Sequence, residues 1–89
     1  MNVRNMKSAS GNDAPNQFII TDGEKLTFQS YKSVIAEHDA GAITLDRDKW
    51  DYSTTTGKYR NIFLGETKKE TERKIKSGEY KLAELNGAS

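Results

Sequence analysis

Large apolar side chains are scarce in this chain: isoleucine, leucine, valine and phenylalanine together supply only 16 of its 89 residues. A composition this lean lies near that of disordered proteins, although the net charge of +1 gives no self-repulsion that would keep the chain open. No apolar run is longer than four residues, which argues against a membrane-spanning helix and against the apolar segment of a signal peptide. We therefore expect one small, marginally stable domain in a protein that stays in the cytoplasm, without membrane contact.

The two ends of the chain differ in composition from its middle. Residues 1–16 are rich in small polar residues and offer too little apolar surface to offset the entropy cost of ordering, about 1–2 kcal/mol per residue. We expect these residues to form a disordered tail and residues 87–89 to form a second one. Residues 17–86 then make a single small domain.

Alternating apolar and polar residues predict strands in the first half of this domain. Residues 18–20 and 25–29 flank the turn signal Asp22-Gly23, which is typical of a β-hairpin. Residues 33–37 and 42–45 alternate in the same way on either side of a loop with a glycine. Residues 80–85 have the pattern of a closing strand.

Two helices are predicted in the second half. Residues 55–64 carry apolar side chains at helical spacing, and the next helix is bounded by a capping box of Thr67 with Glu70 and by Gly78. The expected fold class is α+β, with a small, mostly antiparallel sheet of three to four strands and two short helices packed on one face. The expected core consists of Leu26, Phe28, Val34 or Ile35, Ile43, Leu45, Tyr59, Ile62, Phe63, Ile75, Tyr80 and Leu82.

Few side chains suited to catalysis or metal binding are present. The chain has no cysteine and a single histidine, His38, so thiolate zinc sites and histidine-based triads lack most of their ligands. Asp46, Asp48 and Asp51 do not follow the spacing of a calcium loop, which needs a glycine at its sixth position and a glutamate at its twelfth. We expect a protein that is not an enzyme, with no catalytic residue, no metal site and no cofactor.

Charge is distributed unevenly along the chain. Residues 1–57 carry a net charge of −2, whereas residues 58–81 carry eight basic and four acidic side chains. A clustered basic surface is typical of proteins that contact phosphates. The predicted nucleic-acid or partner-binding residues are therefore Lys58, Tyr59, Arg60, Lys68, Lys69, Arg73 and Lys76. The alternative is that the lysines are solvated and paired at i, i+4 spacing, Glu70 with Lys74 and Glu72 with Lys76.

The start of the first predicted helix combines hydroxyl groups, a glycine and a lysine, as phosphate-binding loops do. The expected anion site is Thr55, Thr56 and Gly57. Ordinary N-capping is the alternative, and the spacing is not that of a Walker A motif, because Tyr59 follows Lys58. Trp50 and Tyr52, just before this helix, are expected to cover the thin core rather than to stack on bases.

The segment from residue 50 to residue 65 reads W-D-Y-S-T-T-T-G-K-Y-R-N-I-F-L-G. It resembles a small uncharacterised family of bacteriophage and prophage proteins with the motif W-D-Y-S-x-T-T-x-K-Y-R-N-x-F-L-G. The resemblance covers about residues 26–86 and leaves the N-terminal residues outside. It implies a phage or mobile-element protein that acts inside a bacterium, with residues 52–60 as the distinctive surface of the family, and it implies no activity.

Two functions from different classes are consistent with this sequence. The first is a non-enzymatic binding module of a phage or mobile element that contacts nucleic acid through the basic helical face. The second is a protein inhibitor of a host defence system, of the anti-CRISPR or anti-restriction type, which occludes its target through Asp46, Asp48 and Asp51. The expected partner is thus a nucleic acid or a host protein, and a core this small also favours a homodimer.

Overall fold

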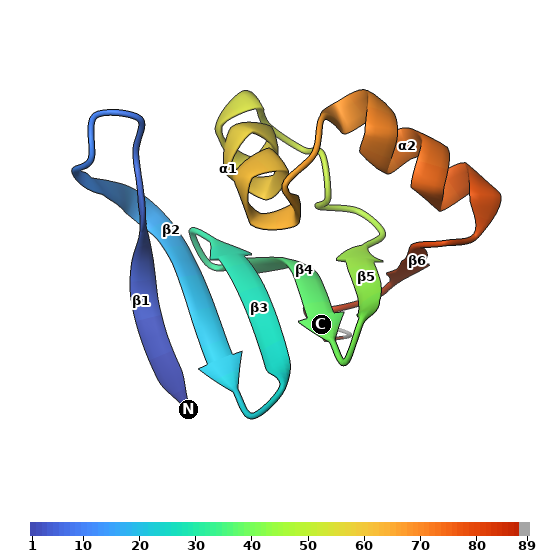
Figure 1. Cartoon of the computed structure of the whole chain (residues 1–89), viewed down its shortest axis with the longest axis horizontal. Helices are drawn as coiled ribbons and strands as arrows, with labels where there is room; N and C mark the ends of the chain where they lie inside the picture. The colour runs from blue at the N-terminus through green and yellow to red at the C-terminus, as the bar shows by residue number, and fades with distance from the viewer. Residues whose placement is uncertain (88–89) are drawn as a thin grey trace.

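The strands follow one another across the sheet in the order in which they occur along the chain. In the computed structural model, which describes residues 1–87, the strands are β1 (Asn2–Lys7), β2 (Asp13–Asp22), β3 (Lys25–Ser30), β4 (Ser33–Asp39), β5 (Ala42–Asp46) and β6 (Lys81–Ala83). Between β5 and β6 the chain forms α1 (Thr54–Leu64) and α2 (Lys68–Ser77), which lie on the same side of the sheet (Figure 1). Because the chain crosses over through these helices, β6 pairs with β5 in parallel, whereas the first five strands pair antiparallel.

This six-stranded mixed sheet corrects the expected sheet of three to four mostly antiparallel strands. Residues 1–16, expected to form a disordered tail, instead contribute β1 and the start of β2. These segments are polar, but Met6 and Ala14 are 5% and 0% exposed and pack in the core with Phe28. Tertiary packing thus overrides the weak strand propensity of the sequence. In the predicted C-terminal tail, residues 88–89 lie outside the described residues.

A side-chain hydrogen bond supports the pairing of β1 with β2 where its register shifts. The shift falls between Asn5 and Lys7, and the Nδ2 of Asn5 donates to the carbonyl of Ala14 at 2.9 Å. The amide of Ser8 donates to the carbonyl of Asn12 at 2.8 Å and so closes the turn between the two strands. One polar side chain and the backbone of the turn therefore satisfy backbone groups of this hairpin.

The core consists of two clusters on the helix-covered side of the sheet. One is built from Met6, Ala14, Phe28, Ile35 and Tyr59, and the other from Ala36, Leu45 and Tyr80. Phe63 of α1 packs against both clusters and stacks on Phe28, with 5.8 Å between the ring centroids. Two residues expected in the core are instead on the surface: Ile62 is 53% exposed and Leu82 37%.

Both helices begin and end at recognisable caps. The capping box predicted for α2 is confirmed, because Thr67 Oγ1 accepts the amide of Glu70 at 3.2 Å and Glu70 Oε1 accepts the amide of Thr67 at 3.1 Å. Gly78 ends α2 in the left-handed conformation, with φ 85°. The helix α1 begins one residue earlier than predicted, after Ser53, whose Oγ accepts the amide of Thr56 at 3.1 Å. Neither helix of residues 1–87 is long and apolar enough to cross a membrane.

A nearly buried carboxylate joins the α1–α2 connection to α2 and to the entry of β6. Glu66 accepts hydrogen bonds from Thr71 Oγ1 at 2.6 Å, Tyr80 Oη at 2.7 Å and Lys74 Nζ at 2.8 Å. Burial alone would raise the pKa of Glu66, but these hydrogen bonds outweigh burial, so its pKa lies below its usual value. The charged form of Glu66 therefore stabilises the folded state.

If β1 is part of the folded domain, Met6→Ala should lower the free energy of unfolding by about 2–4 kcal/mol, since it leaves a cavity in the first core cluster. Val3→Ala on the same strand is the matched control, because Val3 is 56% exposed. Urea unfolding followed by circular dichroism measures both changes. Equal and small effects of the two substitutions would show that β1 does not contribute to the core.

The hydrogen bonds of Glu66 also predict a dependence of stability on pH. Its contribution is complete above the usual pKa of 4.5 and is lost as the pH falls through the lower folded-state pKa, since the unfolded chain binds the proton first. Urea unfolding between neutral pH and about pH 3 should show a steeper loss of stability in the wild type than in Glu66→Gln. Equal slopes for the two proteins would contradict this role.

Candidate nucleic-acid interface

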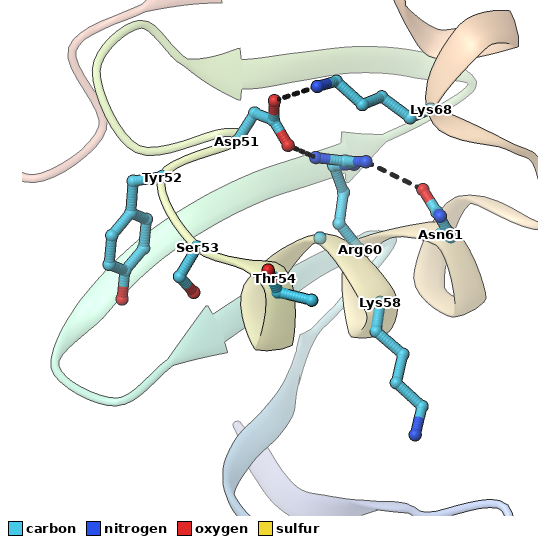
Figure 2. A pocket seen from close by; sticks show the side chains of 9 residues that line it. Asp51, Tyr52, Ser53, Thr54, Lys58, Arg60, Asn61 and Lys68 are labelled. Atoms are coloured by element: carbon cyan, nitrogen blue, oxygen red, sulfur yellow. Dashed lines mark hydrogen bonds and ion pairs between the residues drawn. The ribbon is translucent and has the colours of Figure 1, made fainter.

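An open groove lies where the loop before α1 meets the first turns of α1 and the start of α2 (Figure 2). Its volume is about 600 Å³. We call it the α1 groove. Its lining residues are Asp51, Tyr52, Ser53, Thr54, Gly57, Lys58, Arg60, Asn61 and Lys68.

Arg60 forms part of the wall of the α1 groove from inside the protein. Its side chain is 1% exposed, and its Nη1 donates to the carbonyl of Trp50 at 2.7 Å and to Asp51 Oδ1 at 3.0 Å. Its Nη2 donates to Asn61 Oδ1 at 2.9 Å, and the guanidinium carbon lies 5.1 Å from the centroid of the Trp50 ring. Arg60, predicted as a surface cation, is therefore an internal one that holds the loop against α1.

Asp51 links this arginine to the second helix. Its Oδ1 accepts from Arg60, and its Oδ2 lies 2.7 Å from the Nζ of Lys68 at the start of α2 (Figure 2). Partial burial raises the pKa of Asp51, but the hydrogen bonds from Lys68 and Arg60 outweigh it, so its pKa lies below the usual value. Asp51 is thus ionised at neutral pH and both of its oxygens are engaged.

The other aspartates of the predicted acidic surface are not arranged as a surface either. Asp46 is 1% exposed, and its carboxylate accepts the amides of Lys49 and Leu85, both at 2.8 Å. It therefore holds the turn after β5 and the C-terminal segment. Of the three aspartates expected to contact a protein target, only Asp48 is exposed.

Four of the side chains that line the α1 groove are exposed: Tyr52, Thr54, Lys58 and Lys68. Tyr52 was expected to cover the core, but it is 43% exposed, with the Nζ of Lys49 5.1 Å from its ring centroid. Lys58 is exposed on α1, and Figure 2 shows it and Tyr52 on either side of Ser53 and Thr54. Tyr59, predicted as a binding residue, lies in the core at 6% exposed.

Four of the five cations of α2 are exposed. Lys69, Arg73 and Lys76 are all exposed, and their i, i+4, i+7 spacing places them on one helix face. The alternative pairs, Glu70 with Lys74 and Glu72 with Lys76, do not form within residues 1–87. Lys74 instead pairs with Glu66. We call the exposed cations of the two helices the basic surface: Lys58, Lys68, Lys69, Arg73 and Lys76.

The predicted anion site uses its polar groups inside the protein. The amide of Thr56 donates to Ser53 Oγ, and that of Gly57 donates to the Ser53 carbonyl at 2.9 Å. The hydroxyl of Thr56 is buried against Ser30 of β3, with 2.9 Å between the oxygens, whereas Thr55 is exposed. These two amides therefore cap and build α1 and are not available to an anion.

The predicted binding and anion sites left out five of the lining residues: Asp51, Tyr52, Ser53, Thr54 and Asn61. A usable signal was present, because Thr54, Lys58 and Asn61 follow i, i+4, i+7 spacing and so share one face of α1. That stripe consists entirely of polar residues. A prediction that orients α1 by its apolar residues alone does not detect this polar stripe.

The structure gives no metal centre in the part of the chain that it describes, since residues 1–87 contain no group of three histidine, cysteine, aspartate or glutamate side chains that could hold an ion. His38 lies on β4 and, with Arg4, lines a second groove that is mostly apolar. Within residues 1–87 its imidazole makes no ion pair with a carboxylate.

Comparison with known proteins gives a single result. The family model of DUF8033, described as a family of unknown function, matches residues 1–79. The match includes β1 and β2, which the resemblance noted from the sequence left outside. No curated protein and no solved structure matches the chain significantly.

Asp51→Asn should lower the free energy of unfolding by about 1–3 kcal/mol, because it leaves the buried guanidinium of Arg60 without its counter-charge. Glu72→Gln removes one negative charge from an exposed site of α2 and should change stability by less than about 0.5 kcal/mol. Thermal and urea unfolding of the two variants check this. A loss in Asp51→Asn no larger than in Glu72→Gln would contradict the role assigned to Asp51.

Proposed function

The chain belongs to DUF8033, a family of unknown function, and we propose that it is a non-enzymatic binding module that contacts nucleic acid through the basic surface. One observation carries this proposal. Lys58, Lys69, Arg73 and Lys76 make no ion pair with any residue of 1–87. Exposed cations without an ion-pair partner attract a polyanion, and binding is driven by the release of its counterions.

The geometry of α2 favours an extended anion over a small one. Lys69 and Lys76 are seven residues apart on α2, with Arg73 between them, which is a rise of about 10 Å. An extended polyanion can follow all three cations along the helix, whereas a single small anion could not contact all of them. Lys68 stands next to Lys69 and connects this stripe to the α1 groove.

The non-enzymatic part of the proposal draws on how the carboxylates are used. Asp46, Asp51 and Glu66 are each held by two or more hydrogen bonds or ion pairs within the protein. Their charge stabilises connections between elements. The setting proposed is a bacteriophage or another mobile element acting inside a bacterial cell, and it draws on the resemblance of residues 50–65 to phage and prophage proteins.

The alternative function, occlusion of a host defence protein, has less support from the surface. It was expected to use three aspartates, of which Asp46 is buried and Asp51 is paired with Arg60 and Lys68. We keep it as an outcome of the test below.

The test compares two triple variants with the same change in charge. Lys69→Glu, Arg73→Glu and Lys76→Glu together reverse the α2 stripe, whereas the control reverses three cations that do not belong to the basic surface. The control variant combines Arg4→Glu, Lys32→Glu and Arg47→Glu, all at exposed positions. Fluorescence anisotropy with labelled oligonucleotides, repeated over a range of salt concentrations, measures the affinity.

We expect wild-type affinity to fall with salt, with a logarithmic slope of about −0.7 for each phosphate contacted on a single strand. The α2 variant should lose binding, and the control should keep most of it. Equal losses in the two variants would refute a specific basic surface. If the wild type binds no nucleic acid but captures a host protein from a nuclease-treated bacterial lysate, the proposal is wrong and the inhibitor function replaces it.

A further inference from the structure

The α1 groove offers hydrogen-bond donors to a ligand, because the carboxylate and amide oxygens of its side chains are already engaged. Both oxygens of Asp51 are held, by Arg60 and by Lys68. The Oδ1 of Asn61 accepts from Arg60, and the Oγ of Ser53 accepts a backbone amide of α1. A ligand that needs to donate hydrogen bonds would therefore find few free acceptors there.

The remaining groups of the groove are donors and positive charges. The ammonium group of Lys58, the hydroxyl of Thr54 and the Nδ2 of Asn61 make no hydrogen bond to a side chain of residues 1–87. The Nε of Arg60 is buried and has no hydrogen-bond partner in the same part of the chain. Three cations and one carboxylate line the groove, a net charge of +2. This chemistry fits an acceptor-rich anion, as a phosphate is.

An aromatic ring borders this donor set. Tyr52 is 43% exposed, and it stands between Asp51, which is tied to Arg60, and Ser53, which caps α1. The loop is thus held on both sides of the ring. Lys49 lies near the ring, with its Nζ 5.1 Å from the centroid. Exposed aromatic rings beside cationic grooves are the usual platforms on which unpaired bases stack.

We propose that the α1 groove binds one nucleotide unit of an unpaired strand, with its phosphate at Lys58 and Thr54 and its base stacked on Tyr52. This deepens the proposed function and rests on it, since it names single-stranded nucleic acid as the substrate class. A base inside a duplex is stacked between its neighbours and cannot lie on a tyrosine ring without leaving the stack. The α2 stripe then follows the phosphates of the same strand.

The chain offers a matched control for the tyrosine. Tyr31 is 48% exposed, close to the 43% of Tyr52, but it lies in the turn between β3 and β4. The experiment is fluorescence anisotropy of the full chain with a single-stranded DNA of about 15 nucleotides, the same sequence as RNA, and the DNA duplex. Circular dichroism confirms that each variant is folded.

Single strands should bind the wild type at least tenfold more tightly than the duplex does. Tyr52→Ala should weaken single-strand binding by roughly tenfold and leave the salt slope unchanged, since a stacking contact and not a phosphate contact is lost. Tyr52→Phe should restore the affinity, and Tyr31→Ala should have no effect. Unchanged single-strand binding in Tyr52→Ala, or equal affinity for duplex and single strand, would overturn the inference while the proposed function stands.

The lysine of the groove is tested separately. Lys58→Gln should weaken single-strand binding and reduce the salt slope by about 0.7, the contribution of one phosphate, whereas Lys32→Gln at another exposed position should change neither. A free nucleoside monophosphate is then added as a competitor. At equal concentration it should fail to displace the strand, because the strand is also held by α2. Displacement would show that the ligand is a separate nucleotide. No binding of any nucleic acid would refute both proposals together.

Discussion

The burial of the Arg60 guanidinium is the interaction on which the helical half of this protein depends. Arg60 is the largest side chain that is fully buried, and a buried charge without partners would be costly. Its partners are the Trp50 carbonyl, Asp51 and Asn61. Because Asp51 also holds Lys68, one guanidinium joins the loop after β5 to α1 and to the start of α2. The groove is the outer surface of this internal network.

Polar contacts replace part of the apolar core that the lean composition cannot supply. The hydroxyl groups of Thr56 on α1 and Ser30 on β3 form a hydrogen bond. The carboxylate of Glu66 accepts hydrogen bonds from the hydroxyl groups of Thr71 and Tyr80. Buried hydrogen-bonded groups of this kind specify one arrangement of the elements, because any other packing would leave them unpaired. The carboxylates of Asp46, Asp51 and Glu66 are thereby committed to structure, while Lys58, Lys69, Arg73 and Lys76 form no ion pair within residues 1–87.

Capping chemistry was one part of the fold that could be read from the sequence, since Thr67, Glu70 and Gly78 mark α2 without reference to the rest of the molecule. The orientation of α1 could not, because it depends on tertiary partners. The apolar spacing of Tyr59 and Ile62 suggested one inward face, but Thr56, Tyr59, Arg60 and Phe63 are the inward residues. Arg60 occupies a position where an apolar residue is expected, and Ile62 is left exposed. The strand β1 was missed for the same reason, since its order comes from packing and not from its own propensity.

The most direct measurement is a titration of the isotope-labelled chain with a short single strand, followed in the two-dimensional ¹H–¹⁵N spectrum. We predict that the amide shifts concentrate in residues 52–58 and 61, at the α1 groove, and extend along α2, while the amides of β1 and β2 stay in place. Shifts confined to the sheet, or spread evenly over the chain, would contradict the account of the groove as the binding site.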